Sequence, residues 1–172
     1  MLKLKALAFL AKQFIGVNAS STEAINRMRR ATDGVANGEP WCVCFGQYLV
    51  REVDGFFSEL GLLLEALTTH KLPATESSQQ LWSKMAQESK RDAPVIGALG
   101  IYRLQSNPTF GHLVIVTGIY AGGITTVEGN TSQPGSSGGT EAERNGRGAW
   151  GKNRADGNIP GFDRLGFLLP WG

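Results

Sequence analysis

The sequence predicts an α+β domain in which N-terminal helices pack on a C-terminal antiparallel β-sheet. Apolar residues recur at helical spacing through the first half of the chain, to about residue 90. After Pro94 the pattern changes to β-branched apolar segments that are separated by Gly and Pro turns. The length of 172 residues suits one domain, so residues 1–172 are predicted to form a single unit.

The first predicted element is an amphipathic helix near the N-terminus. Its apolar residues recur at helical spacing and leave the lysines on the solvent side. The inward set is Leu4, Leu7, Leu10 (or Ala11) and Phe14, and the outward set is Lys3, Lys5 and Lys12. Because Lys12 ends the apolar stretch and no clear cleavage motif follows closely, this segment is interpreted as a helix of the domain and not as a signal peptide.

Three more helical segments are predicted before residue 91. A short helix starts near residue 20 and runs through residue 30. Glu39-Pro40 marks the start of a buried helix, because proline suits the first helical position, and residues 56–67 continue in helical style. The last helix is predicted over residues 79–90.

The second half is predicted to supply the strands of the sheet. Strands are expected at residues 95–102, 113–120, 124–128 and 162–171, and Ala121-Gly122-Gly123 is a hairpin signal. The stretch from 129 to 161 is rich in Gly, Ser and Asn and is predicted as a long loop. Such loops are functional or mobile, and a lid over a cleft is one role for this one.

The composition excludes several classes of protein. The 17 basic and 15 acidic residues give a formal net charge of +2, so no nucleic-acid partner is expected. A hydrophobic content of 41% excludes a disordered chain. No apolar run reaches the roughly 18 residues that a membrane span needs. We therefore expect a monomer without a membrane span, and we expect no cofactor.

Cys42 is the strongest candidate nucleophile. It lies in the first turn of the predicted buried helix, where unpaired backbone amides favour a thiolate. Cys44 follows two positions later, about 200° around a helix, so only one of the two thiols can face a given cleft. The alternative is that both are reduced thiols that simply pack in the core.

His112 is the candidate acid–base partner. It follows Gly111 at the start of the predicted strand 113–120, and the alternative is a strand-end histidine bonded to a carbonyl. His70 is the other histidine and lies in a polar connection, so we expect it to be solvated.

The predicted hairpin brings candidate polar residues to one face of the sheet. If Tyr120 pairs with Ile124 across a three-residue loop, Glu128 lies opposite Val116. Three side chains then project from the same face, namely His112, Glu128 and Asn130. A two-residue loop separates them unless a β-bulge restores the alternation. The alternative for Glu128 is a solvated carboxylate at a strand end.

Three motifs together resemble one known family. Gly38-Glu39-Pro40-Trp41-Cys42 leads into a helix, the run from Gly111 to Val116 includes His112, and Glu128-Gly129-Asn130-Thr131 follows. This combination resembles the CHAP family, the cysteine, histidine-dependent amidohydrolases/peptidases of the papain-like superfamily that are common in phage endolysins. The resemblance extends from the first helix to at least Asn130. It implies a papain-like fold and hydrolysis of amide bonds in bacterial peptidoglycan.

The resemblance implies a role for each matched residue. Cys42 is the nucleophile, His112 is the general base and then the acid, and Glu128 orients the imidazole. Asn130 matches a further polar member of the family's site. No calcium site is expected, because Asp33 and Glu39 are too sparse.

Aromatic and basic residues beside the proposed catalytic residues are candidates for substrate contacts. Trp41 and Trp150 are the expected substrate-binding residues. Three arginines, Arg144, Arg147 and Arg154, either grip carboxylates of the peptide stem or are solvated.

The expected function is therefore that of an endolysin-like peptidoglycan hydrolase. It would cleave the N-acetylmuramoyl-L-alanine bond or an amide of the peptide stem through a covalent Cys-His-Glu mechanism. Such a protein is made in the bacterial cytoplasm without a clear signal peptide and acts at the periplasm or cell wall after release. Two alternatives stay open: an interbacterial amidase toxin with the same chemistry, and an inactive papain-like module that binds the cell wall or a phage tail.

Overall fold

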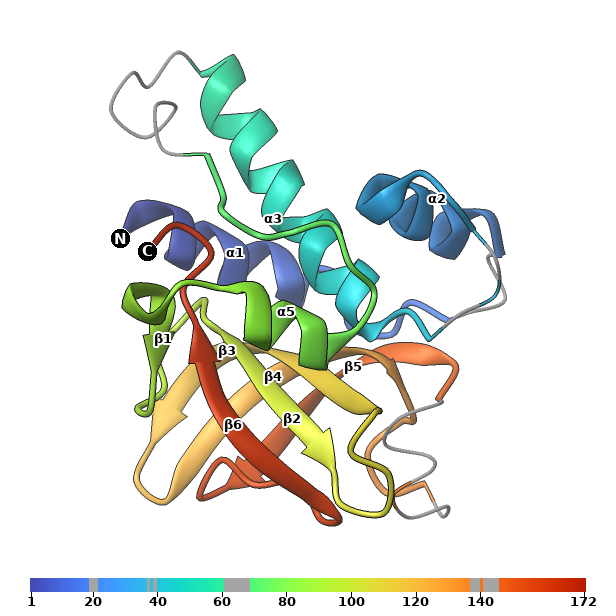
Figure 1. Cartoon of the computed structure of the whole chain (residues 1–172), viewed down its shortest axis with the longest axis vertical. Coiled ribbons are helices and arrows are strands. Elements are labelled where there is room, and N and C mark those ends of the chain that lie inside the picture. The colour runs from blue at the N-terminus through green and yellow to red at the C-terminus, as the bar shows by residue number, and fades with distance from the viewer. Residues whose placement is uncertain (19–21, 37, 39, 61–68, 137–139, 141–145) are drawn as a thin grey trace.

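The computed structural model describes residues 1–18, 22–36, 38, 40–60, 69–136, 140 and 146–172. Three N-terminal helices gather over one side of a curved β-sheet (Figure 1). They are α1 (Leu2–Lys12), α2 (Thr22–Asp33) and α3 (Cys42–Glu59). A shorter helix, α5 (Ser78–Lys84), precedes the first strand. The predicted α+β class, with helices first and the antiparallel sheet second, is confirmed.

The described residues form one six-stranded sheet with the strand order β1-β6-β2-β3-β4-β5. Every pairing is antiparallel. The strands are β1 (Lys90–Arg91), β2 (Leu99–Leu104), β3 (Gly111–Tyr120), β4 (Gly123–Thr131), β5 (Gly148–Ala155) and β6 (Phe162–Leu168). The predicted last strand is confirmed but ends at Leu168 instead of residue 171, and β3 and β4 are longer than predicted.

The main core lies between α3 and one face of the sheet. Phe45 and Leu49 of α3 are fully buried in the same apolar cluster as Leu113 and Ile115 of β3. Gly46 allows the close approach, because a Cβ there would lie 2.6 Å from a methyl of Leu113. This packing fixes the N-terminal turn of α3 against β3.

The opposite face of the sheet is filled by residues of the sheet itself and its turns. Tyr102 and Val114 pack there with Ile159 and Phe162. The Tyr102 hydroxyl donates to the carbonyl of Gly157 at 2.6 Å, which satisfies its buried polar atom. Both faces of the central strands are therefore buried.

Lys3 departs from the predicted amphipathic pattern of the first helix. It is buried, and its ammonium group pairs with Asp54 of α3 at 2.5 Å. Trp171 donates its indole N–H to the same carboxylate at 2.8 Å, and the Lys3 ammonium lies 5.6 Å from the centre of its ring. The expectation of a solvated Lys3 is wrong, because the carboxylate of Asp54 on α3 compensates its buried charge.

The helix boundaries differ from the prediction at two places. Helix α3 begins at Cys42 with Trp41 as its N-cap, and it continues without a break to Glu59. Residues 61–67, which were expected to be helical, lie outside the described residues. The helix predicted over 79–90 ends at Lys84, and a 3₁₀ turn (Gln87–Ser89) and β1 follow it. Strand pairing with β6 overrides the helical pattern there.

The predicted loop over residues 129–161 is wrong in its central part. It contains β5, whose buried side chains include Lys152 and Arg154. A strand with inward-facing cations and several glycines lacks the apolar alternation by which strands are recognised. The predicted strand over residues 95–102 is also shifted, because Gly97 takes a positive φ of 86° in a turn before β2.

We expect Gly129→Ala to destabilise the protein, because this residue lies where β4 contacts α3. A Cβ at this position would lie 2.7 Å from Cβ of Phe45 and 2.9 Å from the ring of Trp41. Overpacking of this kind costs about 1–3 kcal/mol in the free energy of unfolding, which urea denaturation measures. Gly55→Ala in α3 is the matched control, since a Cβ there meets nothing within 4 Å. An equal loss in both variants would contradict the proposed contact.

Candidate active site

The N-terminal turn of α3 places Cys42 at a cavity. Cys42 is the first residue of the helix, and only 4% of its surface is exposed. The cavity has a volume of about 300 Å³ and is lined by Cys42, by Ser77 and Ser78 before and at the start of α5, and by Phe110 and Gly111 before His112. The thiol therefore reaches an open space where a small part of a ligand could lie.

His112 directly follows Gly111, which lines this cavity, but it is not itself among the lining residues. It lies near the start of β3 and its side chain is fully buried. Its Nε2 lies 3.0 Å from Oε2 of Glu128 on β4. Its Nδ1 makes no hydrogen bond of ordinary geometry among the described residues, and Cys42 lies close enough for its thiol and the ring to shift each other's pKa. The imidazole thus lies between the thiol and the carboxylate.

Glu128 is fully buried and accepts hydrogen bonds on both carboxylate oxygens. Oε2 contacts Nε2 of His112 and accepts from Nη2 of Arg154 at 2.6 Å. Oε1 accepts from Nε of Arg154 at 2.8 Å and from the Thr126 hydroxyl at 2.6 Å. The carboxylate is therefore both neutralised and held in one orientation.

The predicted register of the hairpin is wrong, but His112 and Glu128 still meet on one face as expected. The turn has two residues, so Tyr120 pairs with Gly123. A β-bulge between Val116 and Gly118 shifts the pairing, and Ile115 then lies opposite Val127. The extra residue restores the alternation, so His112 and Glu128 meet on one face.

Asn130 lies at a second irregularity of the sheet. The pairing of β4 with β5 shifts between Glu128 and Thr131, and Asn130 takes a positive φ of 59°. Its carbonyl accepts from the amide of Gly146 at 3.1 Å, and its side chain is buried. Asparagine tolerates this left-handed conformation better than most residues. Its role as a polar member of the site stays a prediction.

The contacts of Cys42 and His112 favour an ion pair. Burial raises the pKa of the Cys42 thiol, but the hydrogen bond and charge of His112, with backbone bonds at Leu113 and Val43, outweigh burial and lower it. Burial lowers the pKa of His112, but contacts with Cys42 and Glu128 raise it to about 9. Both shifts favour a thiolate beside an imidazolium over the neutral pair.

Glu128 stays ionised despite its burial. Desolvation raises the pKa of this carboxyl, but hydrogen bonds and charges from His112 and Arg154 hold it far below its usual value. The anion in turn stabilises the imidazolium and fixes the ring, which is the task of the third member of such triads.

The structure places the other predicted site residues away from the Cys42 cavity. Trp41 lies in the core with its ring edge against Phe45. Trp150 of β5 lines a different cavity of about 390 Å³, together with Asn18 and the exposed Arg147. Arg144 lies outside the described residues. Roles of these residues in substrate binding stay predictions.

His70 and Arg154 differ clearly from expectation. His70 is half-buried, its Nδ1 accepts from the amide of Leu72 at 3.2 Å, and burial lowers its pKa. The expectation that it is solvated is wrong. Arg154 is buried on Glu128, so it is neither solvated nor free to grip a substrate carboxylate.

The sequence reasoning missed Thr126 as a member of this cluster. Thr126 and Glu128 lie two positions apart on one strand, so their side chains share a face. That spacing was available in the sequence once Glu128 was chosen. Arg154 could not be found in this way, because its strand was not recognised.

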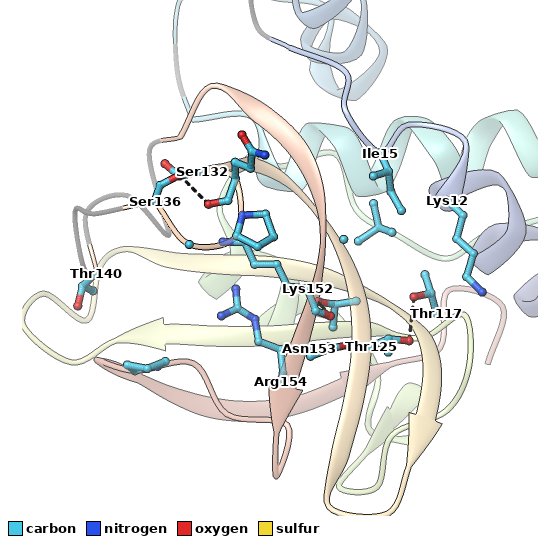
Figure 2. A pocket seen from close by; sticks show the side chains of 17 residues that line it. Lys12, Ile15, Thr117, Thr125, Ser132, Ser136, Thr140, Lys152, Asn153 and Arg154 are labelled. Atoms are coloured by element: carbon cyan, nitrogen blue, oxygen red, sulfur yellow. Dashed lines mark hydrogen bonds between the residues drawn. The ribbon is translucent and has the colours of Figure 1, made fainter.

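A larger cavity of about 810 Å³ lies beside β4 and β5 (Figure 2). None of its lining residues also lines the Cys42 cavity. It is bordered mainly by hydroxyl, amide and basic side chains, which include Lys12, Thr117, Thr125, Lys152, Asn153 and Arg154. Its size alone does not make it the reactive site, since it holds no nucleophile paired with a base in its described lining.

The described residues contain no group of three or more His, Cys, Asp and Glu side chains that could hold a metal ion. The Asp33 carboxylate instead accepts from the amide of Val35 at 3.0 Å, and Glu39 lies outside the described residues. None of the helices described is long and apolar enough to cross a bilayer.

Comparison of the chain with protein-family models, with curated proteins and with solved structures finds no match.

Proposed function

We propose that this protein is a cysteine hydrolase that cleaves amide bonds of bacterial peptidoglycan. The observation that supports the chemistry is the chain of contacts from Cys42, at an open cavity, through the buried His112 to Glu128. The proposal of peptidoglycan as substrate comes from the resemblance of the motifs around these residues to the CHAP family. The scissile bond is the N-acetylmuramoyl-L-alanine bond or an amide of the peptide stem.

The proposed reaction has two steps that are joined by a thioester. The Cys42 thiolate attacks the amide carbonyl, and the His112 imidazolium gives its proton to the departing amine as the C–N bond breaks. In the second step the neutral imidazole removes a proton from water, and the hydroxide attacks the thioester. The acid is released, and the thiolate and imidazolium form again.

The start of α3 supplies a donor for the negative oxygen that forms in each step. Because Cys42 is the first residue of the helix, its N–H has no carbonyl partner within the helix. A donor at such a position stabilises the developing oxyanion by a few kcal/mol. This amide would therefore act as one oxyanion-hole donor.

Digestion of purified sacculi tests the proposed substrate. We expect the protein to release soluble fragments that carry one new amine and one new carboxyl end, and mass spectrometry then identifies the bond. Intact sacculi after prolonged incubation with folded protein would rule out peptidoglycan as the substrate. Turnover of an unrelated protein at a comparable rate would point to a general peptidase.

We expect kcat/KM to fall on the alkaline side with an apparent pKa near 9. The first step needs the His112 imidazolium as the acid, and the contacts with Cys42 and Glu128 raise the pKa of His112 to about 9. Deprotonation above that pH removes the acid. The alkaline limb of kcat/KM can be measured from initial rates between pH 5 and pH 11, with a chromogenic amide that the protein accepts as substrate. A limb near 6.5, the ordinary value of histidine, would contradict the assignment.

A further inference from the structure

A buried arginine, like His112, contacts the carboxylate of Glu128. Arg154 comes from β5 and contacts both oxygens of Glu128, through Nε at 2.8 Å and Nη2 at 2.6 Å. Figure 2 shows its side chain at the wall of the larger cavity, on the strand next to β4. Neither the resemblance nor the expected triad gives this residue a role.

The geometry of the pair limits what Glu128 can do. Arg154 and Thr126 both donate to Oε1, and Arg154 and His112 share Oε2. The planar guanidinium fork fixes the plane of the carboxylate, which a single donor would leave free to rotate. With this plane fixed, Oε2 is held at the Nε2 side of the imidazole.

We propose that Arg154 is a positioning residue of the active site, acting through Glu128 to keep the carboxylate ionised and aimed at Nε2 of His112. Nδ1 then stays the nitrogen that exchanges a proton with Cys42. This inference rests on the proposed function, because a catalytic role needs a substrate. The effect of Arg154 on the reactivity of the Cys42 thiol can nevertheless be measured without any substrate.

Other charged or titratable groups near Glu128 do not replace this contact. The Tyr102 hydroxyl on β2 stays neutral, because burial and the charge of Glu128 raise its pKa to about 12. Lys152 on β5 donates to the Thr131 hydroxyl at 2.6 Å, and Arg164 on β6 donates to the carbonyl of Asp156 at 2.8 Å. Among the described residues, Arg154 is the cation apart from His112 that contacts Glu128 directly.

Loss of Arg154 is expected to shift the pKa values of Glu128, His112 and Cys42 in defined directions. Without its donors the buried carboxyl of Glu128 has a higher pKa, so it takes up a proton at a higher pH. The imidazolium of His112 then loses its counter-ion, its pKa falls, and the thiolate is stabilised less. Reactivity of Cys42 is therefore lost at a higher pH than in the wild type.

The pH dependence of Cys42 alkylation by iodoacetamide tests this inference, with peptide mass spectrometry to confirm the modified residue. In Arg154→Gln we expect the acidic limb of the alkylation-rate profile to move to a pH about one unit higher. At a given pH on that limb, the alkylation rate is then about tenfold lower than in the wild type. Arg154→Lys keeps the charge but lacks the fork, and we expect a smaller shift in the same direction. Arg103→Gln is the matched control, because Arg103 pairs with Asp163 on the exposed side of the neighbouring strands.

A second pair of variants covers the case in which Arg154→Gln does not fold. Thr126→Val removes one donor to Oε1 and keeps the ion pair, so we expect an upward shift of the limb. Thr125→Val is its control, since the Thr125 hydroxyl contacts Thr117 and not Glu128. The inference is overturned if the folded Arg154 and Thr126 variants keep the wild-type profile. If the profiles shift but sacculi stay intact, the inference stands and the proposed substrate is wrong.

Discussion

Replacing Cys42 with alanine is expected to abolish hydrolysis of peptidoglycan and to leave the fold intact. The proposed mechanism has no other nucleophile, because Cys44 is fully buried with its thiol 3.7 Å from a carboxylate oxygen of Glu76. Loss of a covalent nucleophile lowers kcat by about 10⁴-fold or more in enzymes of this kind. Release of soluble fragments from sacculi, measured beside near-UV circular dichroism, separates lost chemistry from lost folding.

Cys44→Ala is the matched control for this prediction. The two thiols lie on the same helix two positions apart, and both are buried and outside any disulfide. We expect Cys44→Ala to keep most of the activity, since its sulfur takes no part in the contacts with His112. Activity that survives in Cys42→Ala but disappears in Cys44→Ala would mean that the wrong thiol was chosen.

Glu128→Ala is expected to lower the free energy of unfolding by about 3–5 kcal/mol. The substitution removes the acceptor of four hydrogen bonds and leaves the guanidinium of Arg154 buried without its counter-ion. Urea denaturation at pH 7 measures the loss. The matched control is Asp163→Ala, which breaks the exposed ion pair with Arg103 and should leave the midpoint near that of the wild type.

The effect of Glu128→Ala should also depend on pH. In the folded protein the pKa of Glu128 is held far below its ordinary value of 4.5. Its stabilising contribution is therefore complete above pH 4.5 and is lost as the pH falls below that value. We expect the difference between wild type and variant to shrink in acid. A difference that is constant from pH 3 to pH 7 would mean that the carboxylate is not paired in the fold.

The sequence was sufficient to find the proposed pair of Cys42 and His112, because the signals for these two residues are local. A proline-marked helix start placed Cys42 in a first helical turn, and a glycine before a β-branched run placed His112 at a strand end. Alternation along a three-residue hairpin predicted Glu128 on the same face as the histidine, and this holds because a bulge offsets the two-residue turn. Each of these inferences needs only the period of one element or the pairing of two neighbouring strands.

The features that were missed depend on contacts between distant segments. The bulge in β3 inserts one extra residue into the pairing of β3 with β4. No residue type in the stretch from Val116 to Gly118 requires this bulge. Lys3 can be buried because its ammonium group forms an ion pair with Asp54 on another helix. Arg154 lies in a glycine-rich stretch that resembles a loop, and it becomes part of a strand when β4 supplies the pairing and Glu128 the counter-charge.

The most direct test of the account is the protonation state of Cys42 in the resting protein. Thiolates absorb near 240 nm, so a pH titration of the wild type minus Cys42→Ala isolates this sulfur from Cys44. The account predicts that the difference signal is already present at pH 7 and is lost in His112→Ala, whose thiol lacks the imidazolium. A signal that appears only above pH 9, with the same midpoint in both proteins, would contradict the proposed ion pair.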